Sequence, residues 1–199
     1  MEKQVIITLG REFGSGGHKI AQKIAQELDI PYYDRNIMDH MFDGNEKMKE
    51  FVEKFEEKVP KLFGSRRVRG YSNSSEEIVA ELQFAFMREK AAAGESFVMV
   101  GRCAEYILRD YSNVISFFVL GDMYDKLQRV MDRCQLDERK ALDKIQRHDR
   151  SRKKFHNTYS DMKWGDSRAY DLCVNASRLG LDKTADVLLA FINERKENF

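Results

Sequence analysis

Short apolar runs alternate with longer amphipathic segments along this chain. Five short runs, several of them apolar throughout, predict buried strands at residues 5–9, 30–33, 97–100, 114–120 and 170–174. Between them, apolar residues recur at helical spacing, which predicts helices over 19–28, 35–42, 46–62, 75–92, 104–108, 122–134, 137–154 and 184–195. This alternation predicts an α/β fold, in which a five-stranded parallel sheet carries helices on both faces.

Composition and length narrow the class of protein. The chain has 199 residues, of which 42% are hydrophobic and 34% are charged. That is the length of one domain with a proper core, so we expect a single domain over residues 1–199. The longest uninterrupted apolar run, 187–192, is far shorter than the roughly 20 residues of a membrane span, and Met1 is not followed by a signal-peptide pattern. We therefore expect a cytoplasmic protein.

The cysteines and the charges refine this picture. Cys103, Cys134 and Cys173 are far apart and odd in number, which favours reduced thiols over a disulfide framework or a zinc pattern. No metal ligand is assigned from the sequence. Residues 139–154 carry eight basic and two acidic side chains, whereas the whole chain has a net charge of only +1. A basic segment on a mildly acidic body favours a local anionic ligand over nucleic acid.

A glycine-rich turn joins the first predicted strand to the first predicted helix. Its sequence over residues 10–19 is GREFGSGGHK. Glycines allow positive φ and close approach of the backbone, so that successive N–H groups converge on a phosphate, and the helix N-terminus adds its dipole. A turn needed only for packing rarely requires so many glycines. The candidate phosphate contacts are Gly10, Arg11, Gly14, Ser15, Gly16, Gly17, His18 and Lys19.

The turn departs from the usual P-loop spelling, G-x-x-x-x-G-K-[ST]. It is one residue longer, with Gly17 in place of the lysine and His18 in place of the hydroxyl residue. Charge on the bridging phosphates must then be met by Arg11, Lys19, an arginine of the basic segment or a metal. Two hypotheses therefore stay open, a kinase and a protein that binds nucleotide without turnover.

Four stretches of the sequence resemble the cytidylate kinase-like family, a bacterial branch of the P-loop nucleoside monophosphate kinases. They read IITLGREFGSGGHKIAQKIAQELDIPYYDRNIM, VMVGRCAEYIL, KIQRHDRSRKKFHNTY and YDLCVNASRLG. The resemblance covers nearly the whole chain. It implies a P-loop kinase fold with a helical acceptor-binding insertion at about 40–93 and a basic lid at about 130–165. It also implies transfer of the ATP γ-phosphoryl group, with Mg²⁺, to CMP or dCMP, with neither nucleic acid nor membrane as a partner.

The resemblance also implies roles for single residues. Asp34 and Arg102 match positions that lie beside the acceptor nucleotide. Arginines of the lid close over the transferring phosphoryl group, and the residue that follows the fifth strand lies along the donor base. The matching residues are Arg147, Arg150, Arg152 and, on the base side, Asn175.

Other interpretations of these residues remain. Asp34 is also a plausible helix cap, and a run of basic residues is often only a solvated face. Arg35, His40 and Cys103 differ from the pattern of cytidylate kinases around the acceptor. A kinase for another small acceptor is therefore an open alternative.

Overall fold

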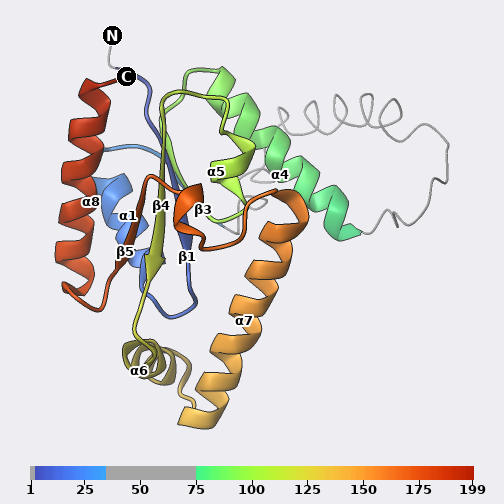
Figure 1. The fold of residues 1–199 in the computed structure, drawn as a ribbon, viewed down its shortest axis with the longest axis vertical. Helices are drawn as coiled ribbons and strands as arrows, with labels where there is room; N and C mark the ends of the chain where they lie inside the picture. The colour runs from blue at the N-terminus through green and yellow to red at the C-terminus, as the bar shows by residue number, and fades with distance from the viewer. Residues whose placement is uncertain (1–2, 35–74) are drawn as a thin grey trace.

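The computed structural model describes residues 3–34 and 75–199. Its five strands form one parallel sheet, and their order is β2-β3-β1-β4-β5. The expected α/β fold is therefore confirmed (Figure 1). The strands are β1 (Ile6–Arg11), β2 (Tyr32–Tyr33), β3 (Phe97–Val100), β4 (Val114–Leu120) and β5 (Leu172–Asn175).

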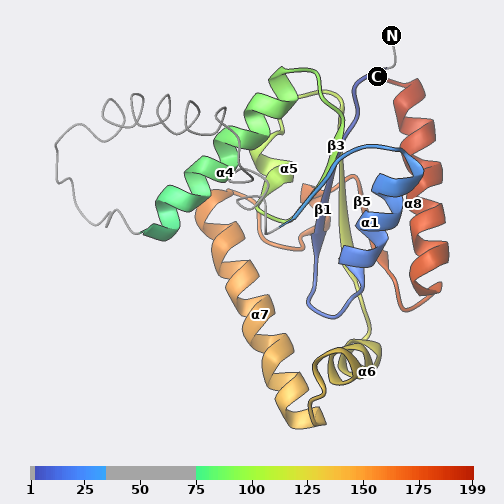
Figure 2. The same cartoon turned by 180° about the vertical axis from the view of Figure 1, so that it is seen from behind.

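Helices cover both faces of the sheet, as Figures 1 and 2 show from opposite sides. One face carries α1 (Gly17–Glu27) and α8 (Gly180–Glu197), and the other carries α4 (Ser75–Ala92) and α5 (Ala104–Ile107). Successive side chains of a strand point to opposite faces. Ile7 of β1 accordingly packs into the core below α1 and α8, and Ile6 packs into the core below α4. Burial on both faces explains why these strands are apolar throughout.

Strand β1 is longer than its apolar run indicates. The sequence predicts that it ends at Leu9, but Gly10 and Arg11 continue the pairing with β4, opposite Phe118 and Val119. Gly10 permits this because a Cβ there would lie 2.7 Å from the Phe118 ring. Arg11 is therefore a strand residue at the carboxyl edge of the sheet, where ligands of such folds bind.

Two helices stand at this carboxyl edge, below the sheet in Figure 1. They are α6 (Met123–Cys134) and α7 (Glu138–Tyr159), and they pack against each other. Helix α7 runs five residues past its predicted end at 154, because Phe155 and Tyr159 pack against Phe84 of α4. The basic segment therefore lies on a helix held at both ends, between α6 and α4.

One short helix remains at the carboxyl-terminal part of the chain, before β5. A short 3₁₀ helix, η1 (Ser167–Ala169), leads into β5. The helices predicted over 35–42 and 46–62 lie outside the described residues, so only α4 of the expected insertion is seen. Among the helices that are described, none has the length and apolar character to cross a membrane.

Candidate phosphate and acceptor site

The loop between β1 and α1 presents free backbone amides at the carboxyl edge of the sheet. Gly14 and Gly16 have φ of +83° and +87°, a conformation that glycine adopts without steric cost, and Gly16 is the N-cap of α1. Within the described residues, no hydrogen bond involves the amides of Gly14, Gly16, His18 or Lys19. Such amides, with the helix dipole behind them, are what a phosphate group requires.

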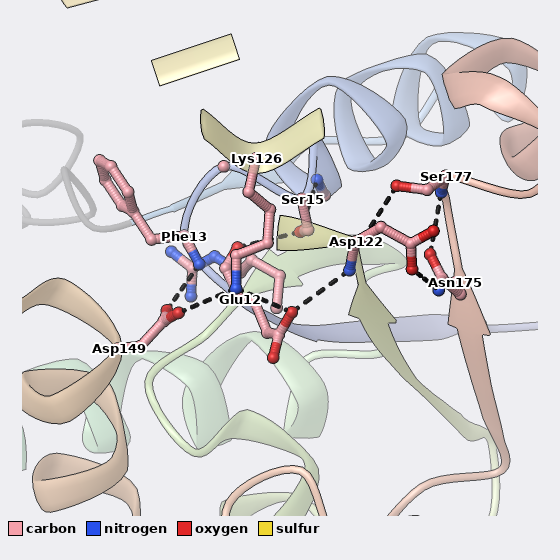
Figure 3. Close-up of polar contacts among 12 residues, drawn as sticks. Glu12, Phe13, Ser15, Asp122, Lys126, Asp149, Asn175 and Ser177 are labelled. Carbon is pink, nitrogen blue, oxygen red and sulfur yellow. Dashed lines mark hydrogen bonds and ion pairs between the residues drawn. The ribbon is translucent and has the colours of Figure 1, made fainter. Parts of the chain in front are cut away.

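A buried lysine, shown in Figure 3, holds the loop in place. Lys126 of α6 is only 3% exposed, and its Nζ lies 3.0 Å from Glu12 Oε2 and 3.3 Å from Asp149 Oδ2. Glu12 also accepts a hydrogen bond from the Gly121 amide at 3.2 Å, and Asp149 accepts one from the Phe13 amide at 2.6 Å. We call Glu12, Lys126 and Asp149 the loop brace.

The loop brace joins segments that are far apart in the sequence. Its members come from the loop, from α6 and from α7, and Glu12 and Lys126 are separated by 114 positions in the sequence. Burial raises the pKa of the Asp149 carboxyl, although the Phe13 N–H and Lys126 oppose that shift. The sequence marked none of the three as a partner of the others. The only indication of these ion pairs in the sequence was the charge of the residues, because a buried lysine that lies near two acids pairs with them.

A pocket of about 430 Å³ lies at the end of β1, where the loop begins. Gly10 and Arg11 form one wall of it, and the turn after β3 and helix α7 form others. Three guanidinium groups line it, those of Arg11, Arg102 and Arg152. Burial, and next the positive charge of Arg152, lower the pKa of Arg11 to about 9, which leaves it charged at neutral pH. An anion in the pocket would relieve the repulsion among these three cations.

The turn after β3 has an unusual backbone. Gly101, Arg102 and Cys103 follow one another with φ of +79°, +60° and +57°. For residues other than glycine this conformation costs about 1–2 kcal/mol each. The Arg11 guanidinium also lies directly against Gly101, so that a Cβ there would displace Arg11 Nη1. Strain of this kind persists where the surroundings enforce it, which is common at functional sites.

The three lid arginines predicted from the sequence occupy different places on α7. Arg152 lines the pocket and donates a hydrogen bond to the carbonyl oxygen of Arg11 at 3.0 Å. Arg147 and Arg150 are exposed and do not line the pocket. Their role in closing over a phosphoryl group stays a prediction.

The predicted residues at the start of α1 and the end of β2 lie side by side. His18 Nδ1 is 2.7 Å from the Tyr32 hydroxyl and 3.5 Å from Asp34 Oδ2. Burial lowers the pKa of His18, and the charge of Asp34 opposes that shift. Lys19 is exposed beside them. Asp34 is thus close to the phosphate loop, although it does not line the described pocket.

Asn175 ties the carboxyl ends of β4 and β5 together (Figure 3). Its Nδ2 donates to Asp122 Oδ1 at 2.8 Å, and its Oδ1 accepts from the Ser177 amide at 3.0 Å. The Asp122 amide in turn donates to Ser177 Oγ at 2.9 Å. Both polar groups of the Asn175 side chain are therefore engaged in shaping this loop.

Aromatic side chains form the remaining wall of the pocket. Trp164 and Tyr170 line it, and both pack on the ring of Phe118, at 5.3 Å and 5.0 Å between ring centroids. From the sequence, Trp164 is interpreted only as a loop anchor in a polar stretch. Phe155 lines the pocket too, so aromatic side chains and three arginines share its lining, a combination suited to a flat ring that carries a phosphate.

Several solved structures share this fold at low sequence identity. A gluconokinase from Sinorhizobium meliloti 1021 is 15% identical, with a TM-score of 0.55 over 100% of this chain and 97% of its own. A shikimate kinase from Bacteroides thetaiotaomicron is 16% identical, with a TM-score of 0.51 over 95% of this chain and 98% of its own. At these identities the likeness shows a shared P-loop kinase fold.

More similar proteins point to a family. The crystal structure of an uncharacterized protein from Eubacterium ventriosum ATCC 27560 is 38% identical, with a TM-score of 0.76 over 96% of this chain and 99% of its own. A cytidylate kinase from Halorubrum lacusprofundi is 26% identical over 107 residues, so that the chain spans only about half of that relative (55%) and the match covers 54% of this chain. The model of the cytidylate kinase-like family matches residues 6–178. This chain therefore belongs to the cytidylate kinase-like family.

Proposed function

We propose that this protein is a kinase that transfers the γ-phosphoryl group of ATP to a small acceptor, with CMP and dCMP as the first candidates. The observation that carries the proposal is the contact between two anion-binding features at one edge of the sheet. Free loop amides lie on one side, and a pocket lined by three arginines lies on the other, with Arg11 joining them. A donor polyphosphate and an acceptor phosphate would then lie next to each other.

The residues present fit a nucleotide polyphosphate. The loop offers the amides of Gly14, Gly16, His18 and Lys19, and glycine at 14 and 16 permits the positive φ and the close packing against Lys126 and Leu181 that give the loop this shape. Bound ATP would supply the phosphoryl group, and its Mg²⁺ would neutralise part of the charge. Glu12 and Asp149 lie beside the loop, but both contact the Lys126 ammonium, so among the described residues these two carboxylates are no dedicated set of ligands for Mg²⁺.

The protein's own part in the reaction is positioning and charge stabilisation. The loop amides hold the donor phosphates, and the pocket arginines hold the acceptor and the developing charge on the transferred group. Helices α6 and α7 cover the carboxyl edge of the sheet and would exclude water, which limits hydrolysis. No protein nucleophile is needed, because the acceptor attacks in line.

The pocket favours an acceptor that already carries a phosphate. Arg11, Arg102 and Arg152 all line it, and, after burial, the positive charges of Arg152 and Arg102 lower the pKa of Arg11, a repulsion that an anionic acceptor offsets and a neutral sugar or alcohol does not. A nucleoside monophosphate offers a phosphate to the arginines and a base to the aromatic side chains of the pocket. Shikimate and gluconate, the substrates named for proteins of the same fold, carry a carboxylate instead and are the main alternative acceptors.

The test is an ADP-release assay with ATP and a panel of acceptors: CMP, dCMP, UMP, AMP, shikimate and gluconate. We expect turnover with a pyrimidine monophosphate and little with the two carboxylates. The Arg102→Met variant should lose acceptor turnover while thermal stabilisation by ATP persists, because Arg102 lies in the pocket and not in the loop. Turnover with a carboxylate alone would replace the acceptor assignment, and no turnover with any acceptor would refute the kinase proposal.

A second candidate function is nucleotide binding without turnover. It is favoured by the glycine at position 17, where P-loop kinases have lysine, and by the engagement of the nearest buried lysine, Lys126, with two carboxylates. Thermal stabilisation by ATP, together with no ADP release for any acceptor, is the result that this candidate predicts.

A further inference from the structure

A buried cluster of three potential metal ligands lies at the wall of the pocket. Cys103, Glu105 and His156 are 3%, 9% and 4% exposed, and one ligand atom from each lies within 4.8 Å of the others. All three line the same pocket, so a small ion could reach them from solvent. The proposed kinase reaction uses none of them.

The contacts of His156 are compatible with a cation in this cluster. Its Nε2 lies 2.6 Å from Glu105 Oε1, and its Nδ1 lies 3.4 Å from Asn157 Oδ1. That Asn157 atom is an oxygen, because it accepts a hydrogen bond from the Trp164 amide at 2.9 Å. Both ring nitrogens therefore face acceptors, but a neutral imidazole has a single N–H. An N–H on Nε2 satisfies the Glu105 contact alone, whereas with the N–H on Nδ1 an extra cation, either a second proton or a metal ion, must lie between Nε2 and the carboxylate.

Cys103 favours the metal ion over the proton. Its thiol makes a 3.9 Å contact with the carbonyl oxygen of His156 and also interacts with the side chains of Glu105 and Ser160, and a backbone with φ of +57° keeps it at this place. A proton shared by His156 and Glu105 would explain neither the strained backbone nor the third ligand. Thiolate, imidazole and carboxylate are the ligands of zinc sites, and three of them with an open fourth position are typical of sites that bind a further ligand.

We propose that Cys103 Sγ, Glu105 and His156 Nε2 bind one divalent transition-metal ion, Zn²⁺ by preference, with its fourth position open to the pocket. Ligand atoms of a tetrahedral zinc site lie about 3.3–3.8 Å apart. The Glu105 carboxylate must therefore move about 1 Å away from His156 Nε2 to admit the ion. The Asn157 contact would keep Nδ1 protonated and leave Nε2 free to ligate.

The charges at the site are compatible with an ion only when Cys103 is deprotonated. Arg102 and Arg152 line the same pocket and repel a free cation. A thiolate and a carboxylate together neutralise a divalent ion, so the loaded site carries no net charge beside the two arginines. Burial, and next Glu105, raise the pKa of the free Cys103 thiol, so that binding at neutral pH must release its proton.

Titration of the full-length, untagged, metal-free chain with Co²⁺ tests this inference. We expect a thiolate-to-Co²⁺ charge-transfer band and visible bands of a four-coordinate ion, which saturate at one ion per chain and disappear when Zn²⁺ is added. Absence of these bands in a folded chain would overturn the proposal, and the extra cation would then be a proton between His156 and Glu105. The readout does not depend on kinase activity, so this proposal and the proposed function can fail separately.

Matched cysteine variants assign the thiolate. The Cys134→Ser, Cys173→Ser double variant keeps Cys103 as its single cysteine, and we expect its Co²⁺ spectrum to equal that of the unmodified chain. Cys103→Ser should lose the charge-transfer band, and Asn157→Leu should weaken Co²⁺ binding about 10-fold to 100-fold. A band that survives Cys103→Ser, or that is lost in the double variant, would refute the assignment. If Cys103→Ser does not fold, the double variant decides alone.

Discussion

The two anion-binding regions of this protein are built in opposite ways. The phosphate loop uses backbone amides, those of Gly14, Gly16, His18 and Lys19, and glycines give it its shape. The pocket uses side chains that arrive from three places: Arg11 at the end of β1, Arg102 after β3, and Arg152 in the middle of α7. A region made of backbone should tolerate most changes of side chain but not an added Cβ. A region made of guanidinium groups should respond in the reverse manner.

The shape of the loop also depends on one side chain, that of Lys126 in α6, and its removal should have the largest effect. Lys126→Met leaves the Glu12 and Asp149 carboxylates side by side without their shared cation. We expect the free energy of unfolding, measured in urea, to fall by about 3–5 kcal/mol. Lys140→Met is the control, because Lys140 pairs with Asp137 on an exposed surface and should change stability little. Equal losses in the two variants would mean that the loop brace contributes nothing special.

Two arginines on one helix sharpen the description of the pocket. Arg152 lines the pocket and Arg150 is exposed, two residues away on α7. We expect Arg152→Met to lower kcat/KM for the acceptor by about 10²-fold to 10³-fold, because the charge of the transferred group loses one donor. Arg150→Met should change kcat/KM by no more than about twofold. A comparable loss in Arg150→Met would instead place that side chain over the phosphoryl group, as the sequence resemblance implies.

A pair of glycines tests the backbone design of the loop. Gly14 and Gly94 both have positive φ, but a Cβ on Gly14 would lie 3.0 Å from the Lys126 carbonyl oxygen, whereas none of the described residues approaches a Cβ on Gly94 within 4 Å. Gly94→Ala should cost about 1 kcal/mol of unfolding free energy, from the backbone alone. Gly14→Ala should cost about 2 kcal/mol or more and abolish thermal stabilisation by ATP. ATP stabilisation that survives in Gly14→Ala would show that the loop amides do not hold the nucleotide.

The smallest effect is expected from pH, through His18 at the start of α1. Burial lowers the pKa of His18 in the folded chain, so the folded state binds this proton more weakly than the unfolded chain does. Its contribution to stability is therefore complete above the unfolded pKa of about 6.5 and is lost as pH falls through the lower folded pKa. We expect the thermal midpoint to fall less steeply between pH 7 and pH 5 in His18→Asn than in the unmodified chain. Identical slopes would contradict this assignment.

Sequence patterns anticipated the local features of the site but not its assembly. The glycine-rich loop after the first strand and the helix that follows it were predicted, because apolar runs and glycine-rich turns act over a few residues, but the first strand ends two residues later than predicted. Arg11 was expected to contact donor phosphates, yet its guanidinium lies against Gly101 in the pocket. The side-chain direction depends on the extension of β1 opposite β4, which the apolar run did not reveal.

The rotation of α7 about its axis and contacts between distant segments explain the parts of the site that the sequence did not predict. Successive residues of an α-helix are rotated by about 100°, so that which arginine of α7 reaches the pocket depends on how the helix is packed. The packing of Phe155 and Tyr159 on Phe84 determines this orientation. Similarly, Glu105 and His156 are 51 residues apart, and no local spacing indicates that they meet.

By itself, the sequence determined the order of strands and helices, the parallel α/β architecture, the family and the loop that offers its amides. The family follows from the resemblance of four stretches of the sequence, and the other properties follow from hydropathy and from backbone preferences, which are local and survive in any surroundings. Only the tertiary structure decided which cation braces the loop, which arginines share the pocket, and that a thiol, a carboxylate and an imidazole meet beside it. Such contacts depend on the packing of distant segments, because charge and distance between side chains act through space and not along the chain.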